Sequence, residues 1–148
     1  LSGLFSDSDI PLLHYRATEN LYCADFNASN LARADVSADA KLKSHGIGIK
    51  TFTEGNKKTL QKVAEFNSQQ ALYNNLTGLD KVKKVAELRN KRLEFTKTAY
   101  GINYFIFHCI VRNKEGFFLF EEVMNSIDIN NIKLISESQH TYTFTDNK

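Results

Sequence analysis

The spacing of hydrophobic and polar residues predicts helices and strands that are interleaved along the chain. Apolar residues follow helical spacing in residues 11–24, 57–73 and 80–100. Pro11 suits the first turn of the first of these helices, and Gly101 is a suitable end for the last. We therefore expect one helix near the start of the chain and two in its middle.

Between and after these helices, the pattern changes to the alternation that is typical of strands. Alternation occurs in residues 34–42 and 46–52, and apolar residues dominate 102–112, 117–123, 132–136 and 141–145. Both faces of the hairpin formed by 102–112 and 117–123 are apolar, so we expect it to lie in the centre of a sheet and to be buried on both sides. The element order predicts a mixed α/β (α+β) fold in which a central mixed β-sheet is flanked by helices.

The first predicted hairpin carries the most informative charges. If strands 38–42 and 46–52 pair through a turn at 43–46, Asp39 lies opposite Lys50 on one face, and Ala40 lies opposite Ile49 on the other. Gly48 has no side chain and would leave space beside Lys50. The simplest interpretation is a solvated cross-strand ion pair, which contributes little to stability.

A second polar pair follows on the next predicted helix. Gln61 and Glu65 are four residues apart and share one side of that helix, away from Leu60 and Val63. Because this helix follows the Lys50 strand directly, its carboxylate could complete an acidic metal site with Asp39.

With these residues, the segment from residue 15 to about 67 resembles the PD-(D/E)xK nuclease superfamily, and particularly type II restriction endonucleases. In that superfamily an acid on one strand and a lysine on the next bind Mg²⁺ and orient the attacking water, as Asp39 and Lys50 would here. The usual acid two positions before the lysine is replaced by Gly48. Some members draw the missing ligand from the following helix, which matches Glu65 beside Gln61, and many carry a glutamate on the first helix, which matches Glu19.

The resemblance implies a restriction-endonuclease-like fold and Mg²⁺-dependent hydrolysis of a phosphodiester bond. Asp39, Glu65 and Glu19 would hold the metal, and Lys50 would polarise the water and stabilise developing charge, with Gln61 beside them. The string Asp39-Ala40-Lys41, with Asp35 upstream, is a second match to the motif. It ranks lower because Asp35 lies only four residues before Asp39 on the same predicted strand.

Charge gives partial support to a nucleic-acid partner. The net charge is only +2, so the case depends on local clusters, because phosphate contacts supply most non-specific affinity for DNA. Basic residues near the hairpin are candidates for contacts to the backbone of double-stranded DNA: Lys41, Lys43, His45, Lys57 and Lys58. The lysines and arginines of residues 80–100 are interpreted as a solvated face. An enzyme that cuts both strands would act as a homodimer.

Composition sets the remaining expectations. The chain has 148 residues, of which 42% are hydrophobic and 24% charged, and we expect a single nuclease-like domain over 1–148. It begins with Leu1 and stops just after a strand-like run, which suggests a fragment of a longer chain. Cys23 and Cys109 lack metal-ligand spacing and are interpreted as reduced thiols of a cytoplasmic protein. No phosphate-binding loop, dinucleotide motif or HNH arrangement occurs.

Two further functions stay open beside the endonuclease. One is a nucleic-acid or protein binding module whose hairpin charges are merely solvated. The other is a degenerate nuclease fold that binds DNA without cleaving it, because the acid expected at Gly48 is missing.

Overall fold

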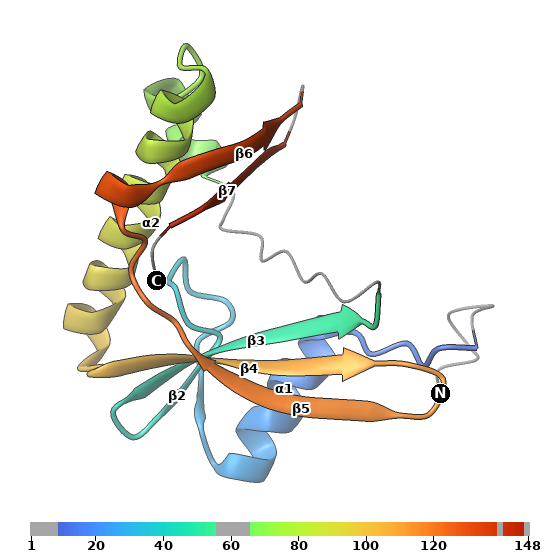
Figure 1. Ribbon diagram of the computed structural model, residues 1–148. Helices are drawn as coiled ribbons and strands as arrows, with labels where there is room; N and C mark the ends of the chain where they lie inside the picture. Colours follow the sequence, from blue (N-terminus) through green and yellow to red (C-terminus); the bar gives the residue numbers. More distant parts are fainter. Residues whose placement is uncertain (1–8, 56–65, 139–140, 147–148) are drawn as a thin grey trace. The chain divides into compact units, whose positions relative to one another are not determined.

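The computed structural model describes residues 9–55, 66–138 and 141–146 (Figure 1). The chain forms two compact units, which we describe separately. The first unit comprises Leu1–Leu60 and Phe95–Met124, and the second comprises Gln61–Glu94 and Asn125–Lys148. The expectation of a single domain over 1–148 stays a prediction.

Helix α1 (Tyr15–Phe26) begins the described part of the first unit. The predicted start at Pro11 is wrong, because His14 has an extended backbone and caps the helix, and its carbonyl accepts hydrogen bonds from Thr18. The carbonyl of Pro11 instead accepts a 2.8 Å hydrogen bond from Nη1 of Arg112. Asn27 ends the helix in the left-handed conformation that is common after helices.

The first unit is built on a five-stranded mixed sheet. Its strands are β1 (Ser29–Asn30), β2 (Ala40–Leu42), β3 (His45–Thr53), β4 (Tyr104–Arg112) and β5 (Phe117–Val123), in this spatial order. All neighbours are antiparallel except β3 and β4, which are parallel and are joined by the long connection through residues 54–103. The predicted mixed sheet is therefore confirmed.

The first hairpin is tighter than predicted. A two-residue turn at Lys43 and Ser44 connects β2 to β3, and Lys43 takes the positive φ of 54° that such turns require. Ala40 consequently lies opposite Ile47, so the predicted pairing of Ala40 with Ile49 is wrong by two residues. An even shift keeps every side chain on its predicted face, and Ala40, Ile47 and Ile49 do pack against Tyr22 of α1.

The second hairpin is only half as buried as predicted. Strand β4 has neighbours on both sides, and alternate residues such as Phe107 and Cys109 are buried. Strand β5 lies at the edge of the sheet and all seven of its residues are exposed. The expectation of two-sided burial is wrong for β5.

The second unit packs two short strands against part of a long helix. Helix α2 (Gly78–Tyr100) contributes its residues up to Glu94, and β6 (Lys133–Glu137) pairs antiparallel with β7 (Tyr142–Thr145) (Figure 1). A 3₁₀ turn, η3 (Ile129–Asn131), precedes β6. The buried residues of this unit's core cluster are Val82, Ala86 and Ile132.

The second predicted helix, 57–73, falls mostly outside the described residues. Its described end is a 3₁₀ helix, η2 (Asn67–Leu72), preceded by Phe66 in a non-helical conformation, so an α-helix does not continue through this end. Phe66 is buried, and the guanidinium of Arg92 lies 4.3 Å from the centroid of its ring. This stacking anchors the segment to α2.

The prediction that the polar residues of α2 form a solvated face is only partly right. Lys91 and Lys97 are exposed, but Nη1 of Arg89 donates a 2.8 Å hydrogen bond to the carbonyl of Asn125. The amide of Asn90 both donates to the carbonyl of Ile127 and accepts from its N–H, each at 2.9 Å. These contacts fix the segment that leads into β6.

Candidate active site

Asp39 lies just before the first residue of β2, at the point where β3 extends beyond this neighbouring strand. Strand β2 begins only at Ala40, while β3 continues past that point, and Oδ2 of Asp39 accepts a 2.7 Å hydrogen bond from the N–H of Ile49. Its own backbone N–H donates to the carbonyl of Ile47 and its carbonyl accepts from Leu31, both at 2.8 Å. The carboxylate is therefore held at the edge of β3.

Lys50 is close to that carboxylate without a direct hydrogen bond. Its Nζ lies 4.0 Å from Oδ2 of Asp39, whereas a charge-assisted hydrogen bond is about 2.8 Å long. The predicted adjacency of Asp39 and Lys50 is thus confirmed, although the predicted register is not. Nζ of Lys50 also lies 5.7 Å from the centroid of the Phe107 ring.

Glu19 brings a second carboxyl group to this place from α1. The residue is 8% exposed, and burial is the main cause that raises its pKa above the ordinary value of 4.5. The negative charge of Asp39 raises the pKa further, while Arg16, Lys50 and His14 oppose the shift. The charges of Asp39 and Lys50 thus both act on Glu19, and its role as a metal ligand stays a prediction.

The same two carboxyl groups act on a neighbouring thiol. Burial raises the pKa of Cys23, and the charges of Glu19 and Asp39 raise it further. Cys23 and Cys109 are both free cysteines, as predicted. A raised pKa keeps Cys23 protonated, so this thiol is an inert neighbour of the site.

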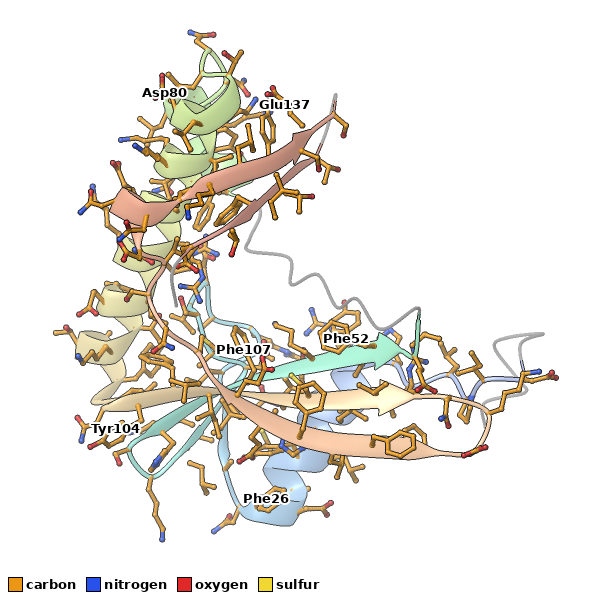
Figure 2. All side chains as sticks on the ribbon, viewed as in Figure 1. Phe26, Phe52, Asp80, Tyr104, Phe107 and Glu137 are labelled. Atoms are coloured by element: carbon orange, nitrogen blue, oxygen red, sulfur yellow. The ribbon has the colours of Figure 1, made fainter. Side chains whose placement is uncertain are left out.

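Gly48 does not leave the open space that the sequence suggested. A Cβ at this position would lie 2.6 Å from Cε of Met124 and 3.0 Å from Cδ1 of Phe107. Phe107 and Phe52 lie on the face of the sheet away from α1 (Figure 2), which is also the face of Lys50. The glycine is required by side chains packed over β3, and no acid could take its place without moving them.

Four of the predicted residues lie outside the described part of the chain: Gln61, Glu65, Lys57 and Lys58. Across residues 9–55, 66–138 and 141–146, no three His, Cys, Asp or Glu side chains are grouped so that they could hold a metal ion. Among the described residues, Lys50 thus lies 4.0 Å from Asp39, and the charges of both act on Glu19. These are two of the three proposed metal ligands together with the proposed catalytic lysine.

The basic residues of the first hairpin lie around its turn. Lys43 is exposed, Lys41 is half-buried, and His45 is exposed at the start of β3. The His45 ring stacks on Tyr104, with ring centroids 5.5 Å apart. Sequence analysis missed Tyr104, because only the parallel register of β3 and β4 brings it beside His45.

A separate polar cluster occupies the α1 side of β4. Nδ1 of His108 lies 3.1 Å from Oε1 of Glu121, its cross-strand neighbour on β5. The ring centroid of His108 is 5.0 Å from that of Tyr22, whose pKa is raised by burial and by Glu121. His108 therefore has its partners within the sheet and on α1.

Compared with protein-family models, curated proteins and solved structures, the chain matches none of them. Within the described residues, no helix is both long and apolar enough to cross a bilayer. Any functional conclusion therefore has to come from the geometry of the site.

Proposed function

We propose that this chain is a Mg²⁺-dependent DNA endonuclease domain that acts on double-stranded DNA, as type II restriction endonucleases do. The observation that carries the proposal is that Lys50 of β3 lies 4.0 Å from Asp39, just before β2, and that the charges of both act on the buried Glu19 of α1. An ordinary surface ion pair between Asp39 and Lys50 would not require a buried carboxyl group such as that of Glu19 nearby. Burying a carboxyl group beside another acid costs free energy. A bound divalent cation would offset that cost.

Each of the three residues has a chemical role in this proposal. Asp39 and Glu19 are carboxylates, the ligands that Mg²⁺ prefers, and Mg²⁺ keeps several waters when it has only one or two of them. Such an ion lowers the pKa of a bound water and neutralises charge on the phosphate. Lys50, 4.0 Å from Asp39, is placed to orient that water and to stabilise the negative charge that develops on the phosphate. Glu65 remains the proposed third ligand.

A DNA-binding domain without cleavage is the second candidate, and the packing at Gly48 favours it. Phe107 and Met124 fill the position of the usual second acid, so an active site depends on a ligand from another element. If no such ligand is present, the basic hairpin would still contact DNA, and the site would be inactive.

Cleavage of plasmid DNA tests the proposal. The intact chain is expected to nick or cut plasmids in Mg²⁺ or Mn²⁺ and to be inactive in EDTA. Lys50→Ala and Asp39→Asn are each expected to reduce the cleavage rate by at least about 100-fold while DNA binding persists.

Matched exposed residues control for general effects of charge. Lys133→Ala on β6 and Asp25→Asn on α1 remove one positive and one negative charge from exposed residues that are not members of the proposed site, and both variants are expected to cut at the wild-type rate. Absence of cleavage by the wild-type chain on diverse DNA, with binding intact, would favour the second candidate. Loss of activity in the controls as well would contradict the assignment of Asp39 and Lys50.

A further inference from the structure

Within the first unit, the described outer edge strand of the main sheet is apolar and exposed. Strand β5 pairs with β4 on one side and, among the described residues, with no strand on the other. Five of its seven residues are large hydrophobic side chains that are 38% to 67% exposed: Phe117, Phe118, Leu119, Phe120 and Val123. An apolar edge of this length is a template for pairing with another strand.

The two edges of this sheet differ in a way that limits association. Proteins usually blunt an edge by making it short or by placing lysine or proline on it. The opposite edge is formed by β1, which has only two residues, Ser29 and Asn30, and by the end of β3, which extends past β2 and carries Lys50. Strand β5 has seven residues without lysine or proline, and its two charged residues, Glu121 and Glu122, lie near its end. Of the two edges, β5 is therefore better suited to pairing, which would limit association to two copies.

We propose that β5 pairs antiparallel with β5 of a second copy of this chain, about a two-fold axis. In such a pair, the residue numbers of two residues that lie opposite each other differ by an even amount. Since successive side chains alternate between the two faces, opposite residues therefore always belong to the same face of the sheet. Phe118 and Phe120 point to one face, and Phe117, Leu119 and Val123 to the other. Each apolar face therefore meets its own copy, so the strand is complementary to itself.

Charge favours the antiparallel direction. Glu121 and Glu122 come just before Val123, the last residue of the strand, while the turn before the strand carries Lys114 together with Glu115. Parallel pairing would align the two Glu121–Glu122 pairs with each other, whereas antiparallel pairing brings each of them toward the neutral turn of the other copy. The proposed direction avoids this repulsion.

The exposed apolar area sets an upper limit for the interface. The five residues expose about 500 Å² per copy. Because their side chains project from the two faces of the sheet, edge pairing would bury part of this surface, and two copies would bury at most roughly 1,000 Å². Backbone hydrogen bonds along the paired edges would therefore supply much of the affinity.

The pairing has a consequence that rests on the proposed function. A two-fold axis perpendicular to the sheet keeps equivalent residues on the same face of the continuous ten-stranded sheet. Lys50 lies on the face of Phe118 and Phe120, so both copies would present Lys50 on one face. This is the arrangement that an enzyme needs to reach both strands of one duplex.

Sedimentation velocity of the intact chain over a concentration series tests the pairing. The wild-type chain is expected to be dimeric, and Leu119→Lys is expected to weaken the dimer by about 100-fold or more, since the two-fold axis repeats the substitution. Ile135→Lys is the matched control: Ile135 on β6 is 65% exposed, close to the 64% of Leu119, and this variant should stay dimeric. Leu119→Thr, which keeps the strand propensity, provides a milder variant if Leu119→Lys fails to fold.

A wild-type chain that stays monomeric, or a dimer that survives Leu119→Lys and Leu119→Thr, would overturn the proposal. Equal dissociation of the Ile135→Lys control would also overturn it, because the effect would then not be specific to β5. Failure of the endonuclease proposal looks different: the chain would dimerise through β5 without cutting DNA. Conversely, a monomer that nicks DNA would refute the pairing alone.

Discussion

At the scale of single residues, Glu19 is the member of the candidate site that is both buried and ionisable. A carboxyl group whose pKa is raised in the folded protein binds its proton more tightly there than in the unfolded chain. The bound proton therefore contributes to the free energy of unfolding. This contribution is fully present below the ordinary pKa of 4.5 and is lost as the pH rises through the raised pKa. Glu19 is therefore expected to destabilise the metal-free protein at neutral pH.

The substitution Glu19→Gln tests this expectation. It removes the buried charge beside Asp39, so the free energy of unfolding at neutral pH is expected to rise, and the difference from wild type should vanish below pH 4.5. Urea unfolding across a pH series without metal measures both effects. Asp25→Asn, on an exposed position of the same helix, is the control and should show neither. A difference that is independent of pH would show that Glu19 is not ionised at neutral pH.

At the scale of elements, a substitution at Gly48 tests how closely Phe107 and Met124 pack over β3. Gly48→Ala places a methyl group 2.6 Å from Cε of Met124 and 3.0 Å from the Phe107 ring, so we expect a loss of about 1–3 kcal/mol in the free energy of unfolding. Because the methionine end is flexible, Met124→Ala is expected to remove part of that cost in the double variant. Denaturant unfolding of the two single variants and the double variant measures the coupling.

Gly55 supplies the matched control for this prediction. No atom lies within 4 Å of a Cβ built at Gly55, so Gly55→Ala is expected to leave stability nearly unchanged. If Gly48→Ala is equally neutral, the space above β3 is open after all. In that case an acid at position 48 becomes feasible.

The elements themselves were largely predictable, because hydrophobic periodicity is local information. Strands 104–112 and 117–123 and the helix over 78–100 lie within a few residues of their predicted ranges, whereas the predicted strand 34–42 is wrong except for Ala40–Leu42. The register of the first hairpin was not predictable, because the pattern of alternate residues is unchanged when a strand shifts by two. The adjacency of Asp39 and Lys50 survived this error for the same reason.

Long-range pairing limited the other predictions. Residues 117–123 are apolar on both faces, which is typical of a central strand. Only the order of strands in the sheet shows that this strand lies at an edge. The packing over Gly48 was invisible for a similar reason, since Met124 and Phe107 are about 60 to 80 residues away in sequence. Local patterns therefore predicted the adjacency of Asp39 and Lys50 better than the packing around these residues.

At the scale of the whole molecule, the net charge of +2 is too small to attract DNA by itself. Binding would have to come from a local patch, and the described first hairpin carries Lys41, Lys43 and Lys50. Such a patch makes a definite prediction, because each phosphate contact releases counterions and steepens the dependence of affinity on salt.

Lys43 is the residue at which this dependence is best tested. It is exposed at the turn of the hairpin, and Lys43→Ala is expected to reduce the slope of log affinity against log salt by about 1. Fluorescence anisotropy with duplex DNA, in EDTA so that nothing is cut, measures the slope. Lys91→Ala, at an exposed position of α2, should leave it unchanged. Equal slopes for wild type and Lys43→Ala would remove the hairpin turn from the interface, whereas a smaller slope for Lys91→Ala would extend the contact surface to α2.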